Sequence, residues 1–170
     1  IKCLFFYSLY NGDKMKILIT GSRSGIAFLT GITLASRGHC VYMTTHTKEE
    51  AYSLKKIVDE LGLKAIVFKL DITDVEDRKL LNTLDIDVLI NHAGIGVGGS
   101  ILDVPIEEVK KNFEVNYFAS YDIVRRIGNR MIKNNKEGKI IIMSSIAGII
   151  PIPFLGVYCS TKSAISTMAT

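Results

Sequence analysis

The chain has 170 residues, of which 48% are hydrophobic and 22% are charged, and its formal net charge is +4. This composition excludes an intrinsically disordered chain, and the length suits a single domain. The charge excess is too small to indicate a nucleic-acid-binding protein. The apolar segment 1–10 is too short for a membrane span, and segment 140–161 is interrupted by proline, glycine and serine.

The cysteines indicate a reducing environment. Cys3, Cys40 and Cys159 lie far apart, form no CxxC pair and have no histidine at zinc-ligand spacing. We therefore expect neither a disulfide framework nor a bound metal, and we predict a cytoplasmic protein.

Apolar runs alternate with helical patterns along the chain. The predicted strands cover 16–20, 40–45, 65–68, 87–90 and 139–144. The predicted helices cover 25–37, 48–61, 74–83 and 105–132, with Pro105 in the first turn of the longest, and a last helix begins near 155. Because the strands are continuously apolar, we expect an α/β fold whose parallel sheet is covered on both faces. Residues 1–14 precede the first strand and are interpreted as an extension that can be removed.

The first predicted strand runs into a glycine-containing turn, residues 20–27, with the sequence Thr-Gly-Ser-Arg-Ser-Gly-Ile-Ala. Such a turn lets the backbone approach a pyrophosphate, which the N–H groups at the start of the next helix then face. A turn that follows a strand and opens a helix has the context required of a dinucleotide-binding site. An ordinary tight turn is the alternative interpretation. Ala27 stands at the third small position, where the fingerprint admits glycine or alanine.

The end of the second predicted strand favours NADP(H) over NAD(H). Residues 43–48 contain no acidic side chain, whereas an acid there would bind the ribose 2′-hydroxyl of NAD and repel the 2′-phosphate of NADP. The threonine hydroxyls, His46 and Arg23 are candidates for holding that phosphate. A solvated loop histidine is the alternative interpretation of His46.

Two asparagines stand out at positions expected to be buried. On the long predicted helix, positions 109, 113, 116, 120, 124, 127 and 131 form a stripe that only Asn116 and Ser120 interrupt. A buried amide costs stability unless it is hydrogen-bonded, so Asn116 is a candidate functional residue. Asn91 follows the fourth predicted strand, where it can hold backbone groups of neighbouring strands, and His92 is interpreted as its non-catalytic neighbour.

The last predicted helix places Tyr158 and Lys162 four residues apart on one face. A cation beside a phenol stabilises the phenolate and lowers the phenol pKa, which makes the group usable for acid–base chemistry near neutral pH. Ser145 is expected at the end of the fifth strand, where its hydroxyl can hydrogen-bond a substrate oxygen. The YxxxK pattern alone is common by chance.

Together these features resemble the short-chain dehydrogenase/reductase family, in its common cytosolic oxidoreductase branch, over about residues 16–170. The resemblance rests on the turn at 20–26, Asp71 in Leu-Asp-Ile-Thr, Asn91-His92-Ala93-Gly94, Val115-Asn116, Ser144-Ser145-Ile146-Ala147-Gly148 and Tyr158-x-x-x-Lys162. His92 departs from the family pattern, which has asparagine there. The resemblance implies a Rossmann-type doubly wound parallel sheet in three α/β/α layers, and hydride transfer between NADP(H) and a small-molecule carbonyl or alcohol.

The resemblance also implies the roles of individual residues. Asn116, Ser145, Tyr158 and Lys162 would form a catalytic tetrad, in which Asn116 supports a proton-relay water. Asp71 would contact the adenine. The implied cofactor contacts, besides Tyr158 and Lys162, are Gly21, Ser22, Arg23, Ser24, Gly25, Ile26, Thr45, His46, Asp71, Ile72, Asn91, Ala93 and Gly94.

Family members continue beyond the position of Thr170 with further strands and a substrate-covering loop. The resemblance therefore implies that residues 15–170 form a cofactor-binding domain without its last strands, and that a full-length version forms homo-oligomers. Two other functions remain open at this point. One is a non-catalytic dinucleotide-binding or sensing module, and the other is a sugar-nucleotide epimerase or dehydratase.

Overall fold

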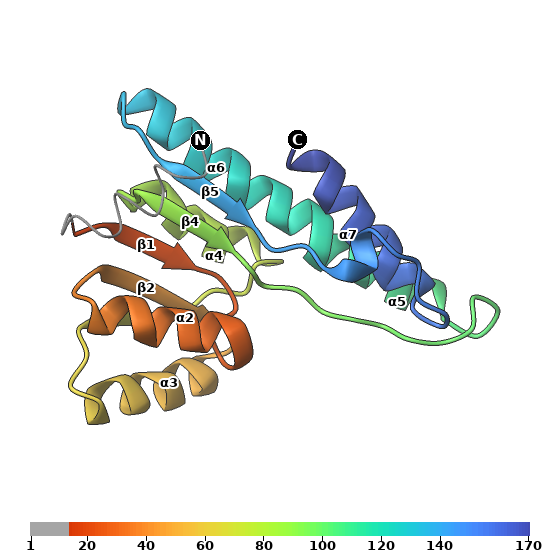
Figure 1. The fold of residues 1–170 in the computed structure, drawn as a ribbon, viewed down its shortest axis with the longest axis horizontal. Coiled ribbons are helices and arrows are strands. Elements are labelled where there is room, and N and C mark those ends of the chain that lie inside the picture. Colours follow the sequence, from red (N-terminus) through yellow and green to blue (C-terminus); the bar gives the residue numbers. More distant parts are fainter. Residues whose placement is uncertain (1–13) are drawn as a thin grey trace.

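The computed structural model describes residues 14–170. The prediction about residues 1–14 therefore lies outside the described residues, except for Lys14. Five strands form one parallel sheet in the order β3-β2-β1-β4-β5 (Figure 1). They are β1 (Lys16–Ile19), β2 (Cys40–Thr45), β3 (Ala65–Lys69), β4 (Val88–Asn91) and β5 (Lys139–Ile142).

Helices follow the strands in alternation, as the sequence predicts. They are α2 (Gly25–Ser36), α3 (Lys48–Glu60), α4 (Val75–Leu80), α5 (Ile106–Phe113), α6 (Ser120–Lys133) and α7 (Gly156–Met168). Short 3₁₀ turns cover Leu81–Thr83 and Ile146–Gly148. Within the described residues, no helix is long and apolar enough to cross a membrane.

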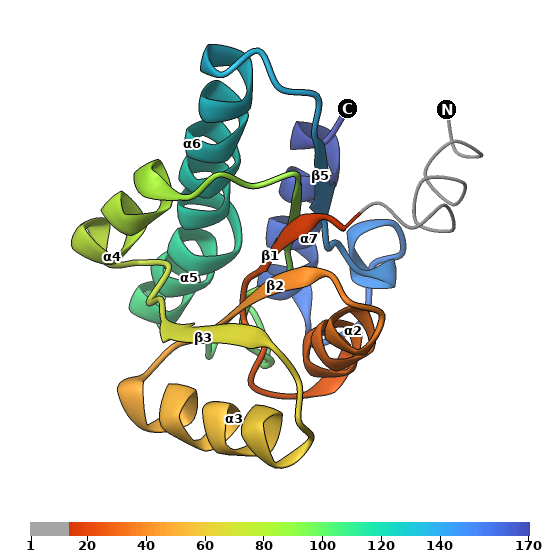
Figure 2. The same ribbon diagram turned by 90° about the vertical axis from the view of Figure 1, so that its left-hand side faces the viewer.

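Helices cover both faces of the sheet and its central strands β1 and β4 are largely buried, which confirms the predicted three-layer fold. Ile17 and Ile19 of β1 pack in one core with α2 and α3, whereas Leu18 between them packs in a second core with α6. Figure 2 shows α2 and α6 on opposite sides of the sheet. Because successive strand residues point to opposite faces, continuously apolar strands fit this double burial.

The long predicted helix is correct in extent, but it contains a π-helical turn at Glu114–Ala119 that the pattern did not show. The buried stripe also differs from the predicted one on both sides of this turn. Asn112 and Ile123 are fully buried, whereas their neighbours Phe113 and Val124 on the predicted stripe are only partly buried. Asn116 lies inside the π turn and is fully buried.

Two local predictions need correction. Pro105 precedes α5 as its N-cap and does not lie in the first turn, because its ψ of 142° is extended and not helical. The fifth strand ends at Ile142, so Ser145 lies beyond it and caps the short 3₁₀ turn that follows. A serine hydroxyl at this position accepts a backbone N–H that the turn leaves without a partner.

Candidate functional site

The chain order of the strands reverses between β1 and β4, and the loops after these two strands meet at the carboxyl edge of the sheet. Thr20 Oγ1 accepts hydrogen bonds from the N–H groups of His92 (2.9 Å) and Ala93 (3.0 Å). It also donates to Asn91 Oδ1 (3.3 Å), and Asn91 Nδ2 donates to the Ser120 carbonyl (3.3 Å). Asn91 therefore ties β4 to the Thr20 side chain and to α6, rather than to strand backbone. Ligands of open α/β sheets bind at such a reversal.

The glycine turn approaches the second loop very closely. Gly21 has φ +70°, and a Cβ atom there would lie 2.9 Å from Ala93 Cα. Gly25 has φ +63°, and a Cβ atom there would meet nothing within 4 Å. The first glycine thus lets two backbones cross, and the second leaves open space at the start of α2. This is a cradle in which a dinucleotide pyrophosphate fits.

We expect Gly21→Ala to lower the free energy of unfolding by about 1–3 kcal/mol, because it combines left-handed backbone with a steric clash. Urea denaturation measures this loss, and a nucleotide titration should show weaker binding. Gly156→Ala is the control, because a Cβ there meets no atom within 4 Å and the backbone is not in the left-handed region. Equal stability of the two variants would contradict the assignment of a tight crossing at Gly21.

A cavity of about 570 Å³ opens beside this crossing, within the size range of cofactor pockets. Predicted cofactor residues that line it are Gly21, Ser24, His46, Asp71, Ile72, Ala93 and Gly94. Its other walls come from the start of the β4–α5 loop and from α5 with its π turn. Five segments that are distant in the sequence therefore meet at one cavity.

Three predicted contact residues present no free side chain to this cavity: Asn91, whose amide is paired as described above, and two residues with hydroxyl groups. Ser22 is fully buried and its hydroxyl donates to the Ile19 carbonyl (3.0 Å). Thr45 is 1% exposed and its hydroxyl donates to the Thr47 carbonyl (3.1 Å). Both hydroxyls shape the backbone around the site.

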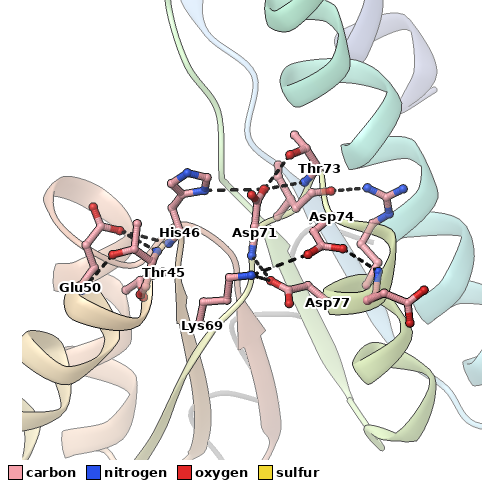
Figure 3. Close-up of polar contacts among 12 residues, drawn as sticks. Thr45, His46, Glu50, Lys69, Asp71, Thr73, Asp74 and Asp77 are labelled. Atoms are coloured by element: carbon pink, nitrogen blue, oxygen red, sulfur yellow. Dashed lines mark hydrogen bonds and ion pairs between the residues drawn. The ribbon is translucent and has the colours of Figure 1, made fainter.

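Asp71 and His46 meet across the carboxyl ends of β2 and β3 (Figure 3). His46 Nδ1 lies 3.6 Å from Asp71 Oδ1, which also accepts from the N–H (2.9 Å) and hydroxyl (2.7 Å) of Thr73. Partial burial opposes ionisation of Asp71, but the hydrogen bonds from Thr73 outweigh it and hold the pKa below its ordinary value. Asp71 is therefore a carboxylate at neutral pH.

The amide of Asn116 makes a reciprocal pair with one backbone residue. Its Oδ1 accepts from the Ile95 N–H (2.8 Å) and its Nδ2 donates to the Ile95 carbonyl (2.7 Å). The same Nδ2 donates to Thr161 Oγ1 (3.0 Å). Asn116 therefore joins the π turn, the loop after β4 and α7.

Tyr158 and Lys162 lie on the same face of α7, as their spacing predicts. Lys162 Nζ lies 5.8 Å from the centre of the Tyr158 ring and donates to the Met143 carbonyl (3.0 Å). Lys162 is 5% exposed, and burial lowers the pKa of its ammonium. The loop after β4 lies against this pair, because a Cβ on Gly94 would be 3.6 Å from Lys162 Nζ and one on Gly96 would be 3.7 Å from the Tyr158 ring.

Ser145 lies in a loop that packs on α7. Its hydroxyl accepts from the Ala147 N–H (3.2 Å), and within the described residues it makes no hydrogen bond to Tyr158. The adjacent Ser144 donates to the Lys162 carbonyl (3.1 Å), and Ser163 donates to the Gly148 carbonyl (3.0 Å). These two hydrogen bonds hold the loop that contains Ser144 and Ser145 against α7, the helix that carries Tyr158.

His92 lines the same cavity. Burial, with a smaller effect of the nearby Lys162 ammonium, lowers the pKa of this imidazole, so it is neutral at pH 7. Its Nδ1 is buried without a hydrogen-bond partner. No group of three or more potential metal ligands is found among residues 14–170.

Sequence reasoning missed several residues of the site. Thr161 and Thr20 are fully buried anchors of Asn116 and of the strand ends. Glu50 is a carboxylate near the end of β2, where its Oε2 accepts from the N–H of His46 (3.1 Å). The pattern Thr47-x-x-Glu50 is a capping-box signal in the sequence, and it predicts that Glu50 folds back onto the residues that precede α3.

Comparison with known proteins gives concordant matches. A family model described as short chain dehydrogenase matches residues 15–170. The probable short-chain type dehydrogenase/reductase VdlC of Helicobacter pylori (strain J99) is 37% identical over 157 residues, 87% of this chain and 54% of the relative. The 3-ketodihydrosphingosine reductase of Bacteroides thetaiotaomicron is 31% identical over 149 residues, 88% of this chain and 54% of that protein.

Solved structures match over the same part. The crystal structure of NAD⁺-bound xylitol dehydrogenase has a TM-score of 0.83 and 25% identity, and the match covers 94% of this chain and 63% of the other. The chain spans about half the length of the two curated relatives.

Proposed function

Because the chain belongs to the short-chain dehydrogenase family, we propose that it interconverts a carbonyl and an alcohol by hydride transfer with NAD(P)(H). The observation that supports this most is the meeting of the cavity with the Tyr158–Lys162 pair. Gly94 lines the cavity and also lies against Lys162 and Asn116. The cavity proposed for the nucleotide and the pair proposed for acid–base chemistry are therefore neighbours.

The chain's own residues would hold the dinucleotide in a defined direction. The cradle at Gly21 and Gly25 suits the pyrophosphate, and Asp71 lies at the end of the cavity near β2 and β3. When bound, the nicotinamide supplies or accepts the hydride. Lys162, which is next to Gly94, would hold the ribose of the nicotinamide half.

Tyr158 would move the proton. In the reducing direction its phenolic oxygen gives a proton to the substrate oxygen, and in the oxidising direction it takes one back. The Lys162 ammonium stabilises the negative charge left on that oxygen, because the phenol and the ammonium share one face of α7. Ser145 would orient the substrate oxygen through its hydroxyl.

Asn116 acts as a positioning residue in this proposal. Its amide holds both backbone groups of Ile95, and so keeps the loop after β4 against Tyr158 and Lys162. A relay water at Asn116 stays a prediction.

We further propose that NADP(H) is preferred to NAD(H) and that the protein is cytoplasmic. The first proposal is supported by Arg23, whose side chain is 71% exposed near the end of β2. A guanidinium group there can bind the 2′-phosphate that only NADP(H) carries. The second is supported by Cys40 and Cys159, which are free thiols.

The proposal is tested by mixing the protein with NADPH and a panel of ketones and following the near-ultraviolet absorbance of the reduced nicotinamide. We expect oxidation of NADPH that depends on one or more ketones, together with nucleotide binding by calorimetry. Binding without turnover across the panel would favour the non-catalytic dinucleotide-binding module. Absence of both binding and turnover would contradict the proposed function.

A further inference from the structure

The loop between β2 and α3 holds the groups that a phosphate on the ribose 2′ oxygen would use. Arg23 reaches this loop from the glycine turn, and the backbone N–H groups of His46 and Thr47 lie at the start of α3. Guanidinium groups and amides at helix N-termini are common protein ligands of phosphate. In a dinucleotide-binding fold, the 2′ position is read near the end of the second strand.

One carboxylate already engages both kinds of group. Glu50 Oε1 lies 3.2 Å from Arg23 Nη1, while Oε2 accepts from the N–H groups of His46 (3.1 Å) and Thr47 (3.4 Å). Figure 3 shows Glu50 and Asp71 on opposite sides of His46. The space around His46 therefore lies between two carboxylates.

Helix capping alone does not account for this arrangement. Thr47 and Glu50 form a capping box, which needs only one oxygen of the carboxylate. The other oxygen faces Arg23, and within residues 14–170 Arg23 has no second ion-pair partner. An ion pair this exposed contributes little to stability. Its main consequence is electrostatic, because it neutralises the cation that a 2′-phosphate would need.

We propose that Glu50 is a specificity-determining residue that weakens binding of nucleotides with a 2′-phosphate and leaves their unphosphorylated counterparts unaffected. A phosphate would have to displace the carboxylate or lie beside it, and like charges repel in either case. A ribose 2′-hydroxyl carries no charge and meets neither obstacle. Arg23 strengthens binding of NADP(H) relative to NAD(H), and Glu50 makes this difference in affinity smaller. This inference rests on the proposed function.

The test is a calorimetric titration of the parent and of Glu50→Gln with 2′,5′-ADP and with 5′-AMP. Glutamine keeps the capping box but removes the charge. We expect 2′,5′-ADP to bind about three- to tenfold more tightly to Glu50→Gln, with 5′-AMP affinity unchanged, and the gain to shrink at high salt. Circular dichroism verifies that α3 remains helical.

Glu49→Gln is the matched control. Glu49 lies in the same first turn of α3, is exposed, and its loss changes the net charge equally. We expect this control to show little gain for 2′,5′-ADP. An equal gain in Glu49→Gln, or no gain in Glu50→Gln, would overturn the inference.

A second variant keeps the inference falsifiable if Glu50→Gln perturbs α3. Arg23→Gln should reduce the affinity for 2′,5′-ADP, and the gain from Glu50→Gln should diminish in its presence. Additive effects of the two substitutions would refute the coupling. A parent protein that binds neither nucleotide overturns the proposed function, and the inference with it. A parent that binds both, with an unaltered ratio in Glu50→Gln, overturns the inference alone.

Discussion

Tyr158→Phe is expected to reduce the rate of carbonyl reduction by about 10²–10⁴-fold, the range typical of a lost acid–base group. The substitution removes only the hydroxyl, and the ring keeps its place beside Gly96 and below the Lys162 ammonium, which lies 5.8 Å from the ring centre. Nucleotide affinity should therefore remain close to that of the parent. Steady-state kinetics with a ketone identified in the panel measures the first effect, and calorimetry measures the second.

Retention of full activity by Tyr158→Phe would remove the proposed proton donor. Tyr121→Phe is a suitable control, because this tyrosine lies on α6, is 49% exposed and takes no part in the proposed chemistry. It should leave both rate and affinity unchanged.

Lys162→Met is expected to impair both functions assigned to the ammonium. The rate should fall by about 10²-fold or more, the scale seen when one preorganised electrostatic group is removed, and nucleotide affinity should fall as well. Methionine fills similar volume without charge, so the fold should persist. An unchanged affinity would show that Lys162 does not hold the ribose.

The same variant has a signature in the pH dependence of stability. Burial lowers the pKa of Lys162 below 10.5, so between the lowered value and 10.5 the unfolded chain binds more protons than the folded one. The free energy of unfolding of the parent should therefore rise with pH in this window, relative to Lys162→Met. Parallel urea titrations at several alkaline pH values compare the two. If the free energies of unfolding of the two proteins changed with pH in the same way, the lowered pKa of a buried Lys162 ammonium would be contradicted.

Patterns local in the chain predicted most of the elements. The bounds of β2 agree with the sequence, and the glycine turn lies between β1 and α2 as its context requires. The spacing of Tyr158 and Lys162 placed them on one face because both lie within one regular helix. Such features depend on neighbouring residues, and helix periodicity and turn chemistry are local properties.

The π turn at Glu114–Ala119 could not be read from the apolar pattern. The stripe around it matches an ordinary helix, and the wider turn places Asn116 where its amide meets Ile95 and Thr161 from distant segments. The burial of Thr45 could not be predicted from the sequence either, because a hydroxyl at the end of a strand can hydrogen-bond either to water or to a backbone carbonyl. Packing against the rest of the sheet decided between them.

Residues close together in the chain were enough to predict the order of the elements, the glycine turn between β1 and α2, and the placement of Tyr158 and Lys162 on one helix face. Which charged side chains lie close together depends instead on how distant segments of the chain pack. Glu50 follows the end of β2 by a few residues and reads as a helix cap, yet its carboxylate faces Arg23 from the glycine turn. Charges interact through space, so the partner of a charged side chain depends on which segments lie near it. Here the carboxyl ends of parallel strands bring the segments together, and a local sequence pattern does not contain that information.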